Sequence, residues 1–259
     1  MKIPKISVLM TIYNHESYLK YSINSILKQS FKNWELIAID NGSTDNTKKV
    51  LKSFRDKRIK KIFLKKNIGR TNCLNYGLDF CRGEYIAIQD SDDISLPLRL
   101  EKQLQSFNKN QDLYLVATNC QLVNERNKIV KKEYINYKNK NLRELLYKNI
   151  IAHSTVMYKK SLISKVGKYP RNFKYAQDYA FYLKVFKKFK IFIIQDTLLK
   201  ARLPHENSET FRVSKTKIMI NEKLQLIKWS SNYLRPTTIE KLRLFIEYYI
   251  NVIKKVILF

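Results

Sequence analysis

Three carboxylates occur within four residues, at Asp90, Asp92 and Asp93, directly after the apolar run Tyr85–Ile88. The run is short and apolar, as buried strands are. Three acids at the end of one strand repel one another, which costs free energy unless a cation compensates. Mg²⁺ or Mn²⁺ suits that role, because it takes few carboxylate oxygens and keeps positions for phosphate. The spacing therefore predicts a divalent metal with a phosphate ligand; the alternative is an acidic loop that caps the helix expected at 97–108.

The elements expected before these acids alternate between strand and helix. Apolar runs predict strands at 6–12, 36–39, 62–64 and 85–89, and helical spacing predicts helices near 19–27, 44–54 and 70–82. This order indicates an α/β fold with a parallel sheet covered by helices. Ligands of such sheets bind at the carboxyl ends of the strands. Three polar clusters lie at those ends and are expected to meet on one rim: Thr11–Asn14, Asp40–Ser43 and Asp90–Asp93.

The second half of the chain has a more mixed pattern. We expect helices near 97–108, 161–166 and 177–189, strands near 113–118, 154–158 and 191–203, and an irregular stretch at 124–149 with a helix near 141–148. Residues 211–259 are expected to form a C-terminal helical extension.

The last helix of that extension is predicted to start at Thr237. Glu240 stands three residues later, which is the spacing of a capping box. Beyond it runs an apolar stripe of Leu242, Phe245, Ile246, Tyr249, Ile253, Val256 and Ile257. The interspersed charges exclude a membrane span. Two interpretations remain: contact with an anionic membrane surface, or packing on the rest of the chain or in a homodimer.

The chain is strongly basic, with 50 Lys and Arg against 22 Asp and Glu and a net charge of +28 over 259 residues. Hydrophobic residues make up 44%, so the chain is not a disordered polyelectrolyte. Such a field attracts polyanions, including nucleic acid, anionic lipid and phosphorylated sugars. The other interpretation is a compositional preference for Lys without a functional meaning.

Three cysteines, Cys73, Cys81 and Cys120, form no pair with the spacing of metal ligands. We expect them to be reduced core residues rather than a disulfide framework. The sequence enters a strand almost at once and has no apolar run of about 18 residues that could span a membrane. These features predict a cytoplasmic protein, with attachment to the inner face of the cell membrane as one interpretation of the C-terminal stripe.

Five sequence blocks occur in the order and with the spacing of one enzyme family. They are residues 7–14, 39–45, 67–69, 75–78 and 83–93. Together they resemble the family 2 glycosyltransferases, inverting enzymes with the GT-A fold, and the resemblance covers residues 5–210. It implies a Rossmann-like, mostly parallel central sheet flanked by helices. The C-terminal helical extension lies outside it.

The resemblance implies that the rim holds a UDP-sugar. The nucleotide-sugar-binding residues expected from it are Thr11, Tyr13, Asn14, Asp40, Asn41, Asn67, Arg70, Asp90, Ser91 and Asp93. Tyr13 would stack on the uracil, and Asp40 would accept hydrogen bonds from the base or ribose; ordinary packing and a turn are their structural alternatives. Family members commonly have a second Asp where this chain has Asn41, a departure that bears on base selectivity.

The resemblance also implies a metal and a catalytic base. Asp90-Ser91-Asp92 resembles the DXD motif, with Asp92 the direct ligand of Mn²⁺ or Mg²⁺ and with Asp90 or Asp93 serving the ribose or a second metal contact. His205 matches a position at which some relatives turn a histidine to the metal or diphosphate. Asp178 matches the catalytic acid at the start of a helix, where it would take the proton of the acceptor hydroxyl.

The resemblance implies an inverting glycosyltransferase that moves a sugar from a UDP-sugar to a hydroxyl of a glycan or a lipid-linked acceptor, in bacterial surface polysaccharide synthesis. Residues 1–105 would bind the donor and residues 106–210 the acceptor, with His153 on the acceptor side. Two alternatives remain open. One is a catalytically inactive relative that acts as a partner subunit, and the other is a basic nucleic-acid-binding protein, which would leave the acid cluster unexplained.

Overall fold

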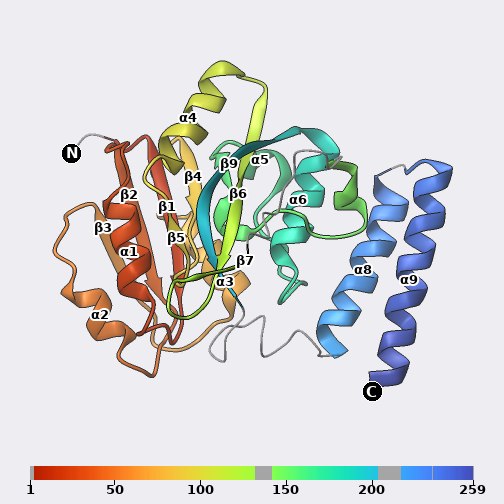
Figure 1. Cartoon of the computed structure of the whole chain (residues 1–259), viewed down its shortest axis with the longest axis horizontal. Coiled ribbons are helices and arrows are strands. Elements are labelled where there is room, and N and C mark those ends of the chain that lie inside the picture. The colour runs from red at the N-terminus through yellow and green to blue at the C-terminus, as the bar shows by residue number, and fades with distance from the viewer. Residues whose placement is uncertain (1–2, 132–141, 204–216, 235, 259) are drawn as a thin grey trace.

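The computed structural model describes residues 3–131, 142–203, 217–234 and 236–258. One nine-stranded sheet forms the centre, helices cover its faces, and a pair of long helices stands beside it (Figure 1). The N-terminal half contains β1 (Ile6–Ile12), α1 (Leu19–Leu27), β2 (Trp34–Asp40), α2 (Thr47–Ser53), β3 (Ile59–Phe63), α3 (Arg70–Leu78) and β4 (Tyr85–Ile88). Its four strands lie in the order β3-β2-β1-β4 and all run parallel.

The rest of the sheet is mixed. It contains β5 (Ile94–Ser95), α4 (Arg99–Lys109), β6 (Leu113–Val123), β7 (Ile129–Lys131), β8 (Met157–Lys159), α5 (Leu162–Val166), α6 (Gln177–Lys188) and β9 (Lys190–Arg202). Beyond β4 the strand order is β8-β6-β9-β5, with β7 beside β6. The strand β8 is antiparallel to both β4 and β6, whereas β6 and β9 are parallel. One ladder of hydrogen bonds thus joins the two halves of the chain.

The expected strand at 154–158 is wrong in its first part. His153–Thr155 form a turn of 3-10 helix, and the strand β8 begins only at Met157. The hydroxyl of Thr155 donates to the carbonyl of Ala152 at 2.6 Å, and the hydroxyl of Ser154 accepts from the backbone N–H of Asp90 at 2.8 Å. Serine and threonine compete with regular strands through such bonds to the backbone. The helix expected near 141–148 is likewise a short 3-10 helix, η2 (Leu142–Leu146).

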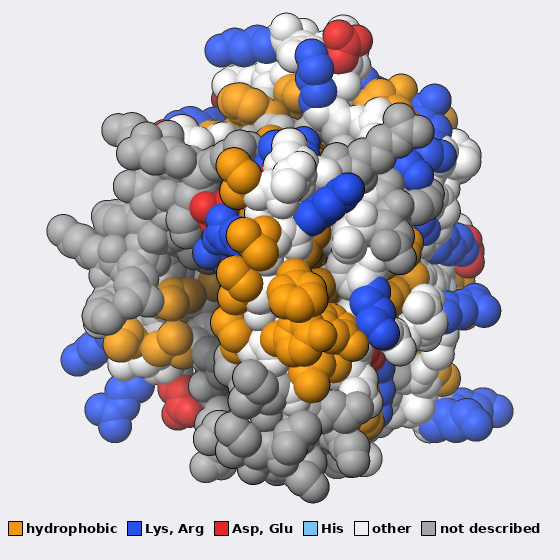
Figure 2. All heavy atoms as spheres, turned by 90° about the vertical axis from the view of Figure 1, so that its right-hand side faces the viewer, with side chains coloured by type: hydrophobic (Ala, Val, Ile, Leu, Met, Phe, Trp, Pro, Cys, Tyr) orange, Lys and Arg blue, Asp and Glu red, His pale blue; other side chains and the backbone are white. Residues whose placement is uncertain are grey.

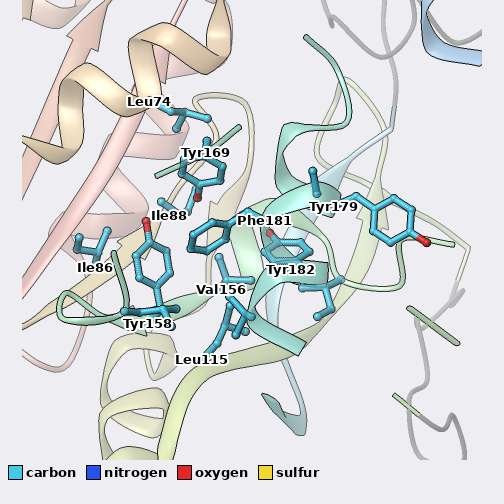
Figure 3. Close-up of a cluster of buried hydrophobic side chains, with 14 of the residues drawn as sticks. Leu74, Ile86, Ile88, Leu115, Val156, Tyr158, Tyr169, Tyr179, Phe181 and Tyr182 are labelled. Atoms are coloured by element: carbon cyan, nitrogen blue, oxygen red, sulfur yellow. The ribbon is translucent and has the colours of Figure 1, made fainter. Parts of the chain in front are cut away.

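Alternate residues of the central strands face two separate cores. Leu9 and Ile39 belong to one hydrophobic cluster, while Val8 and Met10 belong to the other. Successive strand residues point to opposite faces of a sheet, so a continuous apolar run supplies both cores at once. Figure 3 shows one of these clusters, in which aromatic rings of α6, of β8 and of the segment before α6 pack together: Tyr158, Tyr169, Phe181 and Tyr182.

The C-terminal extension consists of α8 (Lys217–Tyr233) and α9 (Thr238–Leu258), which lie side by side (Figure 1). The capping box at the start of α9 is confirmed. The N–H of Thr237 donates to Glu240 Oε2 at 2.7 Å, and the N–H of Glu240 donates to Thr237 Oγ1 at 3.3 Å. Leu226 of α8 belongs to the main hydrophobic core, so α8 packs the extension against the rest of the molecule.

The α/β fold with helices on both faces of a mostly parallel sheet is confirmed. All three cysteines are buried and free, as expected. Within the described ranges, no helix combines the length and the apolar character that crossing a membrane requires.

Candidate functional site

The three polar clusters follow β1, β2 and β4, and the register places these strand ends at one edge of the sheet. Ile12 is opposite Asp40, and Leu9 is opposite Ile88. The loops after β1 and β2 are bonded to each other: Asn14 N–H donates to Ser43 Oγ at 3.0 Å. Asn14 Oδ1 in turn accepts from Thr44 N–H at 2.9 Å. Asn14, with φ of 54°, therefore shapes the rim, and its side-chain oxygen is already occupied.

Asn41 fastens the rim to the loop before α3. It is only 4% exposed; its Nδ2 donates to Asn67 Oδ1 at 3.0 Å, and its Oδ1 accepts from Ile68 N–H at 3.0 Å. Asn67 Oδ1 also accepts from Gly69 N–H at 2.8 Å. The amide thus uses both its donor and its acceptor, which a carboxylate at position 41 could not do. The departure from the family pattern at Asn41 has a structural reason in this chain.

Gly42 makes this close approach possible. Its φ is +74°, a conformation that side chains disfavour, and a Cβ there would lie 2.5 Å from the carbonyl carbon of Lys66. Asp40 is buried, and its Oδ1 accepts from Ser43 N–H at 3.1 Å, which closes the turn. Thr11 and Tyr13 are half-buried at the same edge. The residues at the ends of β1 and β2 that are expected to bind the sugar donor therefore lie close together. Asn14 and Asn41 hold the loops of this edge in place.

The first acid, Asp90, lies in a network with Arg70 and His153. Arg70 Nη2 contacts Asp90 Oδ1 at 2.5 Å and His153 Nδ1 at 2.9 Å, and His153 Nδ1 is 3.1 Å from Asp90 Oδ1. Burial alone would raise the pKa of Asp90, but the charges of Arg70 and His153 outweigh it, and the pKa lies below the ordinary value. Asp90 is therefore an ionised carboxylate held in place by two neighbours.

The third acid, Asp93, bonds to the end of β9. It is 7% exposed, and its Oδ1 accepts from the N–H of Arg202 at 2.8 Å, at the end of β9. Burial raises the pKa of Asp93, and the charges of Asp92 and Asp90 raise it further. The guanidinium of Arg202 donates from Nε to the Asp92 carbonyl at 3.0 Å and from Nη1 to the Asn124 carbonyl at 2.7 Å. Arg202 therefore fixes the backbone of the acid loop.

A second buried arginine, Arg99, contacts the residues directly before the acid loop. Arg99 is fully buried; its Nη1 donates to Gln89 Oε1 at 2.9 Å, and its Nη2 donates to the Ile88 carbonyl at 2.7 Å. Burial lowers the pKa of Arg99 to about 10. Gln89 Nε2 donates to the carbonyls of Asp90 at 3.1 Å and Asp93 at 2.9 Å. The acid loop is therefore held in place by Arg99 and Gln89 as well as by Arg202.

Ser91 and His15 pair with each other. Ser91 is 2% exposed, and its Oγ lies 2.6 Å from His15 Nδ1. Its side chain packs inside the loop, so any contact of Ser91 with a ligand would run through its backbone. Asp92 is half-buried. His205 lies outside the described residues.

Among the residues that the structure describes, no three His, Cys, Asp or Glu side chains are grouped to hold a metal ion by themselves. The donor chemistry nevertheless fits one. Mg²⁺ is usually held by one or two carboxylates, and substrate phosphates complete its coordination. Asp90 and Asp92 are half-buried and Asp93 is buried, and a cation would relieve the repulsion among these three acids. The acid loop therefore suits a metal that arrives with a diphosphate.

Asp178 lies in the first turn of α6, as expected. Its Oδ1 accepts from Tyr179 N–H at 2.8 Å, and its Oδ2 accepts from Asn149 Nδ2 at 3.0 Å. The segment before α6 is held by Glu222 of α8: its Oε1 accepts from Lys174 N–H at 2.6 Å. Its Oε2 accepts from the N–H groups of Tyr175 at 3.0 Å and of Ala176 at 2.9 Å.

Tyr169 contacts the network of the acid loop and lies within electrostatic range of Asp178. Its hydroxyl lies 3.3 Å from His153 Nε2, and His153 in turn contacts Asp90. Burial raises the pKa of Tyr169, and the charges of Asp178 and Asp90 raise it further. Both carboxylates therefore lie near one buried phenol. The site combines a fixed acid loop, a rim of hydrogen-bonding groups and a separate half-buried carboxylate at a helix start.

The residues of this arrangement that were not predicted as site residues include Gln89, Arg99, Asn149, Tyr169, Arg202 and Glu222. Gln89 carried a signal, because a polar residue between an apolar run and three acids invites a structural role. Asn149 and Glu222 carried none, since their partners are 29 and 46–48 residues away along the chain.

The acid loop, the hydrogen-bonding rim and the carboxylate of Asp178 lie on a mixed α/β sheet. The family model of glycosyl transferase family 2 matches residues 7–167. The chain therefore belongs to this family and is a glycosyltransferase.

Similar proteins are also described as glycosyltransferases. An uncharacterized glycosyltransferase of Methanocaldococcus jannaschii is 34% identical over 222 residues, which cover 83% of this chain and 76% of the relative. The O-antigen biosynthesis glycosyltransferase WbnJ of Escherichia coli is 40% identical over 185 residues, or 70% of this chain and 71% of the relative.

Solved structures show the same fold. Staphylococcus aureus TarS 1-349 in complex with UDP-GlcNAc has a TM-score of 0.73 at 21% identity, covering 95% of this chain and 72% of that chain. The mannosyltransferase PcManGT of Pyrobaculum calidifontis, in complex with GDP-Man and Mn²⁺, has a TM-score of 0.70 at 16% identity, covering 98% and 73%. The GT-A fold is thereby confirmed.

Proposed function

We propose that the protein is an inverting glycosyltransferase that moves a sugar from a UDP-sugar to a hydroxyl of a glycan or lipid-linked acceptor. The observation that carries the proposal is the pairing of the fixed acid loop, Asp90–Asp93, with the separate carboxylate of Asp178 near the same buried phenol. The UDP-GlcNAc bound to TarS supports a UDP-sugar donor, and the name of WbnJ supports a role in surface polysaccharide synthesis.

The donor would lie along the rim. Tyr13 would stack on the uracil and Asp40 would accept from its ring N–H, with Asn41 and Asn67 holding the loops in place. Arg70, already next to Asp90, would approach the diphosphate or the base. In this proposal residues 1–105 bind the donor, residues 106–210 bind the acceptor and residues 211–259 form the helical extension.

Asp92 would hold Mn²⁺ or Mg²⁺, together with Asp90 or His205 and the diphosphate oxygens. Such an ion stabilises the negative charge that develops on the departing nucleotide. The part of this chain is to fix the geometry: Arg202 and Gln89 hold the loop backbone from both sides, so the Asp92 carboxylate keeps its position.

Asp178 would act as the base. Its carboxylate takes the proton from the acceptor hydroxyl as that oxygen bonds to the anomeric carbon, and the bond from this carbon to the diphosphate oxygen breaks. The nucleoside diphosphate, UDP, leaves with the electron pair, and attack from the opposite side inverts the anomeric centre. The first turn of α6 places this carboxylate near the positive end of the helix dipole.

The test compares Asp178→Asn with Glu247→Gln, a matched loss of one carboxylate on α9. A general base contributes roughly 10²–10⁴ in rate, so we expect transfer by Asp178→Asn to fall by that factor while UDP-sugar binding stays within twofold. Transfer is followed by UDP release from a panel of UDP-sugars with saccharide acceptors, and UDP-sugar binding by calorimetry. Unchanged turnover in Asp178→Asn would refute the assignment of the base.

The buried, free cysteines suit a reducing compartment, and we propose a cytoplasmic location.

A further inference from the structure

One face of α9 is exposed and apolar. Leu242, Phe245, Ile246 and Tyr249 follow one another at i, i+3, i+4 and i+7, which is one stripe of a helix. This α9 apolar face has the following exposed fractions: Ile239 81%, Leu242 61%, Phe245 58%, Ile246 50%, Tyr249 48% and Ile250 40%. Figure 2 shows hydrophobic side chains gathered on this side of the molecule with Lys and Arg side chains around them.

The opposite side of α9 is firmly attached. Leu244 is 2% exposed, and the guanidinium of Arg143 forms two hydrogen bonds with the carboxylate of Glu240, the second at 2.6 Å. The Arg243 guanidinium lies 4.2 Å from the centre of the Tyr147 ring. The helix therefore has a packed side and an open side, and the open side carries its large apolar residues.

The fully exposed charged side chains in the described part of α8 and α9 are all basic. Lys223, Lys228, Lys241 and Arg243 are exposed. Within the described part of α8 and α9, no acidic side chain is fully exposed: Glu222 is buried, Glu240 is paired with Arg143, and Glu247 is half-buried. A second copy of a chain with a net charge of +28 would bring like charges against this face. An anionic lipid surface complements both its charge and its apolar character.

We propose that α9 lies in the plane of an anionic membrane surface, with its apolar face in the headgroup region and the neighbouring Lys and Arg side chains on the lipid phosphates. This inference does not depend on the proposed reaction, because it concerns binding alone. It places the glycosyltransferase domain at the membrane through the contact of α8 with the core and the ion pair of α9 with η2.

The experiment is sedimentation of the full chain with vesicles of equal parts phosphatidylglycerol and phosphatidylcholine, and with vesicles of phosphatidylcholine alone. The test variant is Phe245→Glu with Tyr249→Glu. Its matched control is Tyr21→Glu with Phe192→Glu, because these two aromatic residues are exposed to a similar extent, 54% and 46%, elsewhere on the molecule. Thermal unfolding checks that both variants are folded.

We expect the parent chain and the control to bind the anionic vesicles and the test variant to bind at least tenfold more weakly. Equal binding of the two double variants would overturn the proposal. So would a parent chain that ignores vesicles but forms a dimer in light scattering that the test variant cannot form, because the occupant would then be a second copy.

An independent observation concerns Glu222, whose buried carboxylate accepts three backbone N–H bonds from residues 174–176, directly before α6. We infer that Glu222 is a positioning residue for Asp178. Glu222 lies on α8, beyond the residues 7–167 that match the family model. The inference rests on the proposed role of Asp178. It assigns Glu222 no contact with substrate, since Glu222 would act only by holding the segment before α6.

Glu222→Gln tests it, since the amide keeps the size but presents an N–H to backbone N–H groups. We expect kcat to fall at least tenfold, with the KM for UDP-sugar and calorimetric donor binding within twofold; Glu247→Gln is the control. If Asp178→Asn is inactive while Glu222→Gln keeps its kcat, the positioning role is refuted and the proposed function stands. If Asp178→Asn remains active, the assignment of the base fails, and the positioning role of Glu222 loses its ground with it.

Discussion

At the scale of single residues, the site is built from polar groups that bond to one another before any ligand arrives. Arg70, Asp90 and His153 form one network, and Asn41 and Asn67 form another. Preorganised polar groups reduce the reorganisation that a charged ligand would otherwise require. A substitution in either network should therefore act on loop geometry as well as on direct contacts.

Asn41→Asp is informative, because it restores the second acid of the family pattern. In this chain it would place a carboxylate oxygen opposite Asn67 Oδ1, which already accepts from Gly69 N–H. A buried polar group left without its partner costs about 1–3 kcal/mol. We expect Asn41→Asp to lower the free energy of unfolding by about that amount in urea denaturation. The control is Asn72→Asp, on the exposed side of α3. Equal stability of parent and Asn41→Asp would show that the amide pair is dispensable.

The acidic residues could be predicted because chemistry and position coincide: three acids after a buried strand need a common explanation. The residues that hold these acids in place could not be predicted. Arg202 reaches the acid loop from 109 residues away, and Asn149 reaches Asp178 from 29 residues away. Such contacts depend on the packed fold, and no local spacing encodes them.

At the scale of elements, the buried parallel strands were predictable because their runs are apolar on both faces. The boundary at β8 was not, since the hydroxyls of Ser154 and Thr155 divert the backbone into a turn. The capping box of α9 was predictable, because its two residues stand three apart in sequence. The ion pair between Glu240 and η2 is a tertiary contact that the sequence did not indicate.

This ion pair should make the attachment of α9 sensitive to pH. The hydrogen bond from Arg143 is the main cause that lowers the pKa of Glu240 from 4.5 to about 2, with the Thr237 bonds adding to it. A carboxylate with a lowered pKa stabilises the fold above its unfolded pKa, and this contribution is lost as the pH falls through the folded value. The contribution of Glu240 is therefore complete above pH 4.5 and disappears toward pH 2.

We expect Glu240→Gln to melt below the parent at neutral pH, with the difference in Tm shrinking as the pH falls from 4.5 toward 2. Thermal unfolding followed by circular dichroism measures both proteins over this range, so the other titrating carboxylates cancel in the comparison. A Tm difference that stays constant with pH would contradict the role of the ion pair. Glu125→Gln, an exposed acid near β7, is the control.

At the scale of the whole molecule, the net charge of +28 gains a more specific meaning. A nucleotide sugar and an anionic lipid surface are both polyanions, and the proposed sites for them lie on different parts of the fold. Membership of glycosyl transferase family 2 favours these partners over nucleic acid.

The donor site should also be visible in global stability, because a ligand that binds only the folded state raises Tm. We expect UDP with Mn²⁺ to stabilise the parent chain and an excess of chelator to remove most of this effect. Asp92→Asn should lose the metal-dependent part alone. Thermal shift assays with UDP, Mn²⁺ and both together make the comparison. Full metal-dependent stabilisation of Asp92→Asn would remove Asp92 from the metal assignment.

The short strand β8 sets a limit on how the chain length can vary. Met157 pairs with Ala87 of β4 and with Val116 of β6, and three residues earlier Ser154 bonds to Asp90. Successive strand residues face opposite sides, so adding or deleting one residue in β8 would exchange its two faces. His153 would then lose its place beside Asp90 and Tyr169. We therefore expect insertions in surface loops to destabilise the protein less than the insertion of a single residue between 153 and 159.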